Sequence, residues 1–132
     1  MKPEIIKAIN LKETFTPERC FIAENCRSSD GKVSVARARV KAGVTTISHH
    51  LNEIDEIYII TKGAGIVQFE NLEPTQVTAG DVVYIPAGAS QKITNTGKSD
   101  LIFYCVCTPG FNQDCYVDDE KTGSAKKQDA DF

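Results

Sequence analysis

The chain has 132 residues, enough for one compact domain and too few for two ordinary ones. Apolar residues make up 41% of it and charged residues 25%, which is the composition of a globular protein and excludes a disordered or coiled-coil one. Its 15 Lys and Arg against 18 Asp and Glu give a net charge of -3, so we expect no nucleic acid and no anionic membrane as partner.

Signals for export or membrane insertion are not expected in this chain. The opening stretch, MKPEIIKAINLKETF, mixes charged residues into its apolar ones, unlike the apolar core of a secretory signal. Apolar runs are far shorter than the roughly 18 residues of a membrane-spanning helix. Five cysteines, an odd number, predict free thiols and no disulfide framework. We therefore expect a cytoplasmic protein.

The region from residue 31 to 109 carries short runs of β-branched and aromatic residues separated by Gly, Pro and Asn, which is typical of an all-β fold. The first run, 32–40, alternates in polarity, so that Arg37 and Arg39 share one face of the strand. We expect these arginines to pair on the outer surface or in a dimer, because an unpaired charge inside a barrel is costly. Binding of an anionic substrate is the alternative.

Five further strands follow, divided by Gly and Pro. The runs on either side of Lys62–Gly65 predict a β-hairpin. The last run is apolar on both faces, which favours a strand covered on both sides, as in a sandwich or small barrel. Cys105 and Cys107 lie two apart on it, and we expect both thiols to be buried. The predicted strands are 32–40, 56–63, 64–70, 81–88, 91–97 and 100–109.

Two sets of spaced residues in this region resemble the two motifs of the cupin family. The first motif is G-x5-H-x-H-x4-E-x6-G. Its positions are held here by Gly43, His49, Leu51, Glu56 and Gly63. The spacing agrees throughout, and the second histidine of the motif is replaced by leucine.

The second cupin motif is G-x5-P-x-G-x2-H-x3-N. Its positions are held by Gly80, Pro86, Gly88, Gln91 and Asn95. The spacing again agrees, and glutamine replaces the histidine. Eight matching positions over two motifs make the resemblance specific for the fold.

Residues 86–97, 100–103 and 107–109 are similar to a subgroup of small single-domain cupins of the conserved-barrel type, in which Leu and Gln replace two of the usual metal-binding histidines. The resemblance implies an all-β cupin double-stranded β-helix, an antiparallel β-sandwich or jelly-roll barrel. It places the cupin barrel at 31–109, after an N-terminal lead-in, 1–30, that packs on it. A C-terminal extension, 110–132, follows and is expected to be mobile from about residue 117. No single activity defines the subgroup.

The resemblance also implies a site for a divalent metal inside the barrel. Four positions hold His, His, Glu and His in the parent family, and His49, Leu51, Glu56 and Gln91 here. Leucine cannot ligate, and glutamine offers only a neutral amide oxygen. The expected ligands of a Zn, Ni, Mn or Fe ion are therefore His49, Glu56 and Gln91.

We expect the ligand pocket beside this site to be lined by Leu51, Tyr58 and Asn95. Each polar residue also has a structural alternative. His49 can hydrogen-bond Glu56 without a metal. Tyr58 can pack in the core with its hydroxyl satisfied, and Asn95 can hold a turn.

From these features we predict a small-molecule-binding cupin whose reaction is unassigned. One hypothesis is a divalent-metal-dependent enzyme of isomerase, dioxygenase or lyase type. The alternative is a non-catalytic, ligand-binding or structural cupin without metal. The expected partners are a small organic ligand and a second copy of the chain in a homodimer. The fold itself does not decide between these functions.

Overall fold

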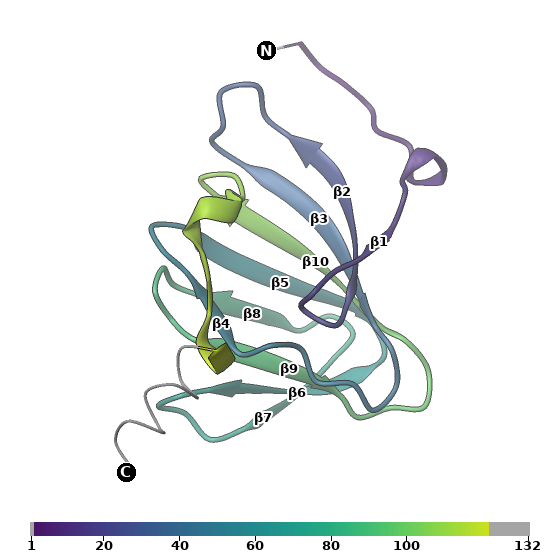
Figure 1. Ribbon diagram of the computed structural model, residues 1–132. Helices are drawn as coiled ribbons and strands as arrows, with labels where there is room; N and C mark the ends of the chain where they lie inside the picture. Colours follow the sequence, from purple (N-terminus) through teal and green to yellow (C-terminus); the bar gives the residue numbers. More distant parts are fainter. Residues whose placement is uncertain (1, 122–132) are drawn as a thin grey trace.

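The computed structural model describes residues 2–121, which form two antiparallel β-sheets facing each other (Figure 1). The predicted all-β cupin fold, an antiparallel sandwich, is confirmed, and each predicted strand is present. The strands are β1 Thr14–Phe15, β2 Phe21–Arg27, β3 Ser34–Val40, β4 His49–Leu51, β5 Asp55–Lys62, β6 Ala64–Phe69, β7 Thr75–Thr78, β8 Val82–Ile85, β9 Gln91–Asn95, β10 Leu101–Thr108 and β11 Tyr116–Asp118. Short 3-10 helices span Ala8–Asn10 and Gln113–Cys115. None of the helices within residues 2–121 has the length and apolar character to cross a membrane.

The larger sheet has six strands in the order β1-β2-β3-β10-β5-β8, and the smaller has five in the order β11-β4-β9-β6-β7. Strand β10 lies between β3 and β5, so that Cys105 is opposite Ala36 on one side and Tyr58 on the other. Alternate residues of each strand face the space between the sheets. The two sheets thereby enclose both the apolar core and the candidate site.

The interior between the two sheets has two zones, because the strand register brings large apolar side chains together at one end only. At one end of β10, Leu101 is opposite Val40, and nearby Ile60, Ile93 and Phe103 complete a closed apolar core. Towards the other end the inward side chains of β3 are small, and polar groups replace apolar ones on β5. The core therefore fixes the strands at one end, and a cavity remains at the other.

The predicted hairpin at Lys62–Gly65 is wrong. Strand β5 pairs with β10 and β8, whereas β6 pairs with β7 and β9, so the chain crosses from one sheet to the other at this corner. Gly63 makes the crossing possible, because its φ is +90° and an added Cβ would lie 2.8 Å from the Asp100 carbonyl oxygen. A local turn signal does not tell whether the two strands it joins will pair with each other.

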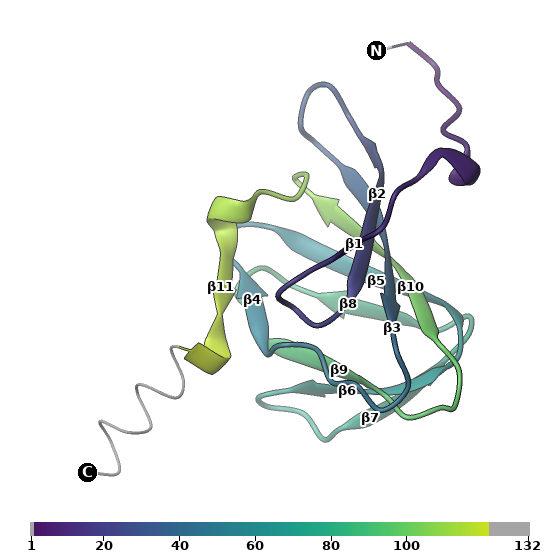
Figure 2. The same cartoon turned by 45° about the vertical axis from the view of Figure 1, so that its right-hand side comes forward.

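The two flanking segments add strands to the sheets. In the lead-in, β2 pairs with β3 at the edge of the larger sheet. Arg39, on the outer face of β3, forms ion pairs with Glu13 at 2.9 Å and Asp100 at 3.0 Å, the surface pairing that the sequence predicts. Figure 2 shows β11 lying beside β4 at the opposite side of the molecule.

The C-terminal extension was expected to be mobile from about residue 117, and the structure places Val117 in strand β11. Asp119 and Glu120 continue the contact, since Asp119 accepts a hydrogen bond from Ser90 at 2.6 Å and Glu120 accepts one from the Ser48 amide at 2.9 Å. The acidic residues that look like a solvated tail thus bind specific donors. The remainder of the predicted extension, 122–132, lies outside the described residues.

Candidate functional site

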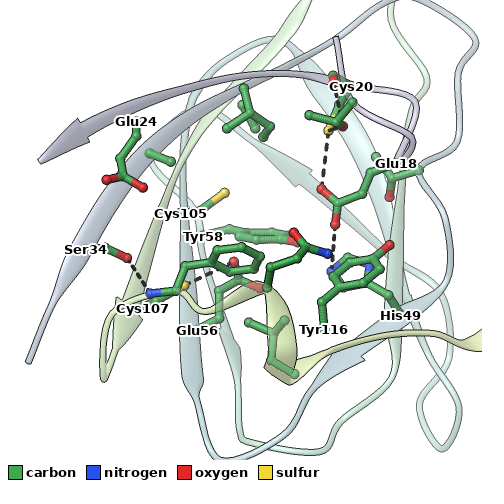
Figure 3. Close-up of a pocket in the computed structure, with 18 of the residues that line it drawn as sticks. Glu18, Cys20, Glu24, Ser34, His49, Glu56, Tyr58, Cys105, Cys107 and Tyr116 are labelled. Carbon is green, nitrogen blue, oxygen red and sulfur yellow. Dashed lines mark hydrogen bonds and ion pairs between the residues drawn. The ribbon is translucent and has the colours of Figure 1, made fainter. Parts of the chain in front are cut away.

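A cavity of about 280 Å³ lies between the sheets, at the end where β10 finishes (Figure 3). It exists because β3 presents Ser34, Ala36 and Ala38 inward, and their short side chains leave room in front of the sheet. Aromatic rings enclose it on other sides. They belong to Tyr58, Phe103, Phe111 and Tyr116. The volume is at the lower end of the range for small-molecule sites.

Glu56 brings a buried carboxyl group into this cavity. Its side chain comes from β5, and only 7% of the residue is exposed. The Cys107 thiol, 3.6 Å from Oε2, is the hydrogen-bond donor that it meets among the described residues, so Oε1 is left for a ligand. Burial, reinforced by the negative charge of Glu18, raises the pKa of Glu56 to about 7.

His49 stands at the start of β4 with its ring almost fully buried. Nδ1 lies 2.8 Å from the Ile47 carbonyl oxygen, which can only accept, so Nδ1 carries the proton that it donates. When the ring carries this proton alone, Nε2 is an acceptor. It lies 3.3 Å from the Gln91 amide nitrogen and 3.6 Å from Glu18 Oε1.

Gln91 and Tyr58 form a hydrogen-bonded pair behind the histidine. The Gln91 amide donates to the Tyr58 hydroxyl at 2.7 Å as well as to His49. Gln91 Oε1 is buried without a hydrogen-bond partner among the described residues. Burial raises the pKa of the Tyr58 hydroxyl well above its ordinary value, so this group remains protonated.

Two residues of the cavity, Glu18 and Tyr116, are not predicted as site residues from the sequence. Glu18, in the loop before β2, reaches towards His49, as Figure 3 shows. Tyr116, the first residue of β11, stacks its ring on the His49 imidazole with centroids 5.0 Å apart. Neither lies in a motif or a periodic run, so the sequence contains no signal that would have identified them.

The structure brings together most, and not all, of the predicted site residues. His49, Leu51, Glu56 and Tyr58 line the cavity, and Gln91 contacts it through its hydrogen bonds. Asn95, which was expected in the pocket, is not among the lining residues.

Asn95 instead holds the chain around it. Its amide nitrogen donates to the carbonyl oxygens of Val40 and Ser99, each at 2.8 Å. Its side-chain oxygen accepts from the Gly97 amide at 2.8 Å. The position therefore serves the turn after β9, the structural alternative noted for it.

The donor set does not fit a divalent metal site. Within residues 2–121, no group of three or more His, Cys, Asp or Glu side chains is placed to hold a metal ion. Gln91 engages its amide with His49 Nε2 and the Tyr58 hydroxyl, and Leu51 offers no donor. Hydrogen bonding and proton exchange are the chemistry that these side chains supply by themselves.

The thiols in the cavity are unreactive in character. All five cysteines are free, as expected, and Cys20, Cys105 and Cys107 line the cavity. Burial raises the pKa of Cys20 to about 12 and that of Cys105 well above its ordinary value. Protonated thiols are weak nucleophiles, so these residues line the cavity and donate weak hydrogen bonds.

Comparison with known proteins agrees with this architecture. The profile of the Cupin_2 family, a cupin domain, matches residues 36–107. The chain belongs to the cupin family. The matched cupin segment runs from β3 to β10 and contains His49, Leu51 and Glu56, whereas Glu18 and Tyr116 lie outside it.

Similar proteins are found in archaea and bacteria. An uncharacterized protein of Methanocaldococcus jannaschii is 35% identical over 83 residues, which are 63% of this cupin and 66% of that protein. An oxalate-binding protein of Thermotoga maritima is 33% identical over 107 residues, covering 69% of this chain and 85% of that protein. The crystal structure of a predicted oxalate decarboxylase from Thermotoga maritima has a TM-score of 0.72 at 23% identity, over 80% of this chain and 99% of that one. This last likeness shows the shared fold.

Proposed function

We propose that this cupin binds a small organic molecule in the cavity between its sheets. The observation that carries the proposal is the buried carboxyl of Glu56, which faces the cavity with a single weak donor, the Cys107 thiol. Buried polar groups are normally hydrogen-bonded, and a ligand supplies the missing partner. The oxalate-binding relative supports a small-molecule function for this fold.

A screen of fragments by ligand-observed NMR tests this proposal. We expect fragments to bind the wild-type protein and to lose their signal with Ala36→Phe, because the added ring fills the space in front of β3. Tyr104→Phe, on the outward face of β10, is the matched control and should retain every hit. Hits that survive Ala36→Phe, or a wild-type protein that binds no fragment, would contradict binding in the cavity.

Proton transfer is the reaction that these side chains can supply, and it favours an isomerase or lyase among the enzyme types considered. Glu56 has both ionisation states within reach at neutral pH, because its pKa is about 7. His49 provides a second acceptor in the same cavity. Bound fragments with a carbonyl group should exchange their α-hydrogens for deuterium in D2O faster with wild type than with Glu56→Gln. Equal exchange rates would favour the non-catalytic binding module.

We also propose a homodimer formed through the outer face of the larger sheet. Ile59, Val82 and Tyr84 expose apolar surface there, on the neighbouring strands β5 and β8. Contiguous apolar surface of this kind marks an interaction site. A second copy of the chain would cover it by two-fold symmetry, which needs no further partner.

A further inference from the structure

The charges that line the cavity are of one sign. Four carboxylates line it, from Glu18, Glu24, Glu56 and Asp118, and within the described residues no Lys or Arg side chain does. Glu24 is neutralised by Arg27, which donates to both of its oxygens at 3.1 and 3.2 Å. Asp118 Oδ1 accepts from the Glu120 and Lys121 amides.

The charges left facing the interior are therefore those of Glu18 and Glu56. Glu18 lies 3.6 Å from His49 and is three-quarters buried, and Glu56 is nine-tenths buried with one carboxyl oxygen unpartnered. The two carboxylates are close enough that the charge of one opposes ionisation of the other. An anionic ligand would add a third negative charge to a poorly hydrated space that no Lys or Arg side chain of the described residues lines.

Aromatic rings in the cavity wall also favour a positively charged ligand. Tyr58, Phe103, Phe111 and Tyr116 all line the cavity, and the face of an aromatic ring attracts a cation. A small inorganic ion cannot fill a cavity of about 280 Å³ whose walls are largely aromatic and aliphatic. An organic cation matches both the carboxylates and the rings.

We propose that the cavity selects organic ammonium ions, with the ammonium group between Glu18 and Glu56 and the carbon skeleton against the aromatic rings. The inference rests on the proposed binding function and names the ligand class of that same site. It distinguishes this cupin from its oxalate-binding relative, whose ligand by name is an anion.

Three probes of nearly equal shape test the charge preference by isothermal titration calorimetry at pH 7.5: benzylamine, benzyl alcohol and benzoate. We expect benzylamine to bind about 10-fold or more tightly than benzyl alcohol, and benzoate to bind least. In Glu18→Gln/Glu56→Gln the advantage of benzylamine should disappear, while benzyl alcohol binds as before. Glu73→Gln removes the same charge from an exposed loop and should keep the preference.

The outcomes separate the two proposals. Benzoate binding as tightly as benzylamine, or all three probes binding equally, would overturn the ammonium preference and leave the binding function standing. Failure of all three to bind, together with an empty fragment screen, would overturn the binding function itself. Should the double variant not fold, the single variants and the wild-type ranking of the probes decide the matter.

Discussion

Replacing Glu56 by glutamine is expected to stabilise the protein at alkaline pH. The side chain keeps its size and its place on β5, and it loses the charge that burial disfavours. Folding raises the pKa of Glu56 from its ordinary 4.5 to about 7, first through burial and then through the charge of Glu18, against a small opposing effect of the Cys107 hydrogen bond. The folded state therefore holds a proton on Glu56 at pH values where the unfolded state has released it.

The sign and size of the effect follow from this difference. A group whose pKa is raised by folding contributes most stability below its unfolded pKa and loses that contribution as the pH rises through its folded pKa. Each pKa unit corresponds to about 1.4 kcal/mol. Ionisation of Glu56 therefore lowers the free energy of unfolding by roughly 3 kcal/mol as the pH rises from acid values to pH 8. Most of this loss falls between pH 5 and pH 8.

Urea unfolding of chelator-treated protein at pH 5 and pH 8 measures the effect. The stability of Glu56→Gln relative to wild type should increase by about 2 to 3 kcal/mol between these pH values, with unchanged dependence on urea. Glu73→Gln, on an exposed loop, should show no such change. A relative stability that is the same at both pH values would mean that Glu56 is solvated, and the account of the cavity would be refuted.

Three further predictions concern the metal positions, the thiols and the assembly. The double change Leu51→His and Gln91→His should tighten Zn²⁺ binding by well over about 10-fold in a chelator competition. Equal binding by wild type and the folded double variant would show that the four positions do not converge. Exposed Cys26 should react with a thiol reagent well before buried Cys107, and simultaneous labelling would contradict the burial. Wild type should have the mass of the proposed dimer in light scattering and Val82→Glu that of a monomer, and equal masses of the two would exclude this face.

The fold could be predicted from the sequence because its signals are local and repeated. Alternating strands and glycines at fixed spacing specify the β fold, and Gly63 shows why, since its backbone conformation and crowded surroundings exclude other residues. The pairing across that corner could not be predicted. The pairing depends on which sheet each strand joins, and contacts between residues far apart in the sequence determine this.

The candidate site was predicted only in part, for a similar reason. His49 and Glu56 follow from the motif, because residues two apart on a strand share a face and neighbouring strands align them. Glu18 and Tyr116 arrive from outside the periodic region and meet His49 only in the folded chain. Asn95 occupies a motif position and yet serves the backbone, because its amide is satisfied by Ser99 and Gly97 in its own turn and by the Val40 carbonyl at the end of β3.

Leu51 and strand β11 affect His49 in the same way. Leu51 supplies no ligand, and its backbone pairs with Tyr116, which begins β11. That pairing sets the tyrosine ring against the imidazole of His49, the side chain that a metal would need. Nε2 of His49 instead meets an amide and the Glu18 carboxylate. A pocket whose histidine is stacked and hydrogen-bonded, and whose carboxylates stand among aromatic rings, is suited to an organic cation rather than to a chelated ion.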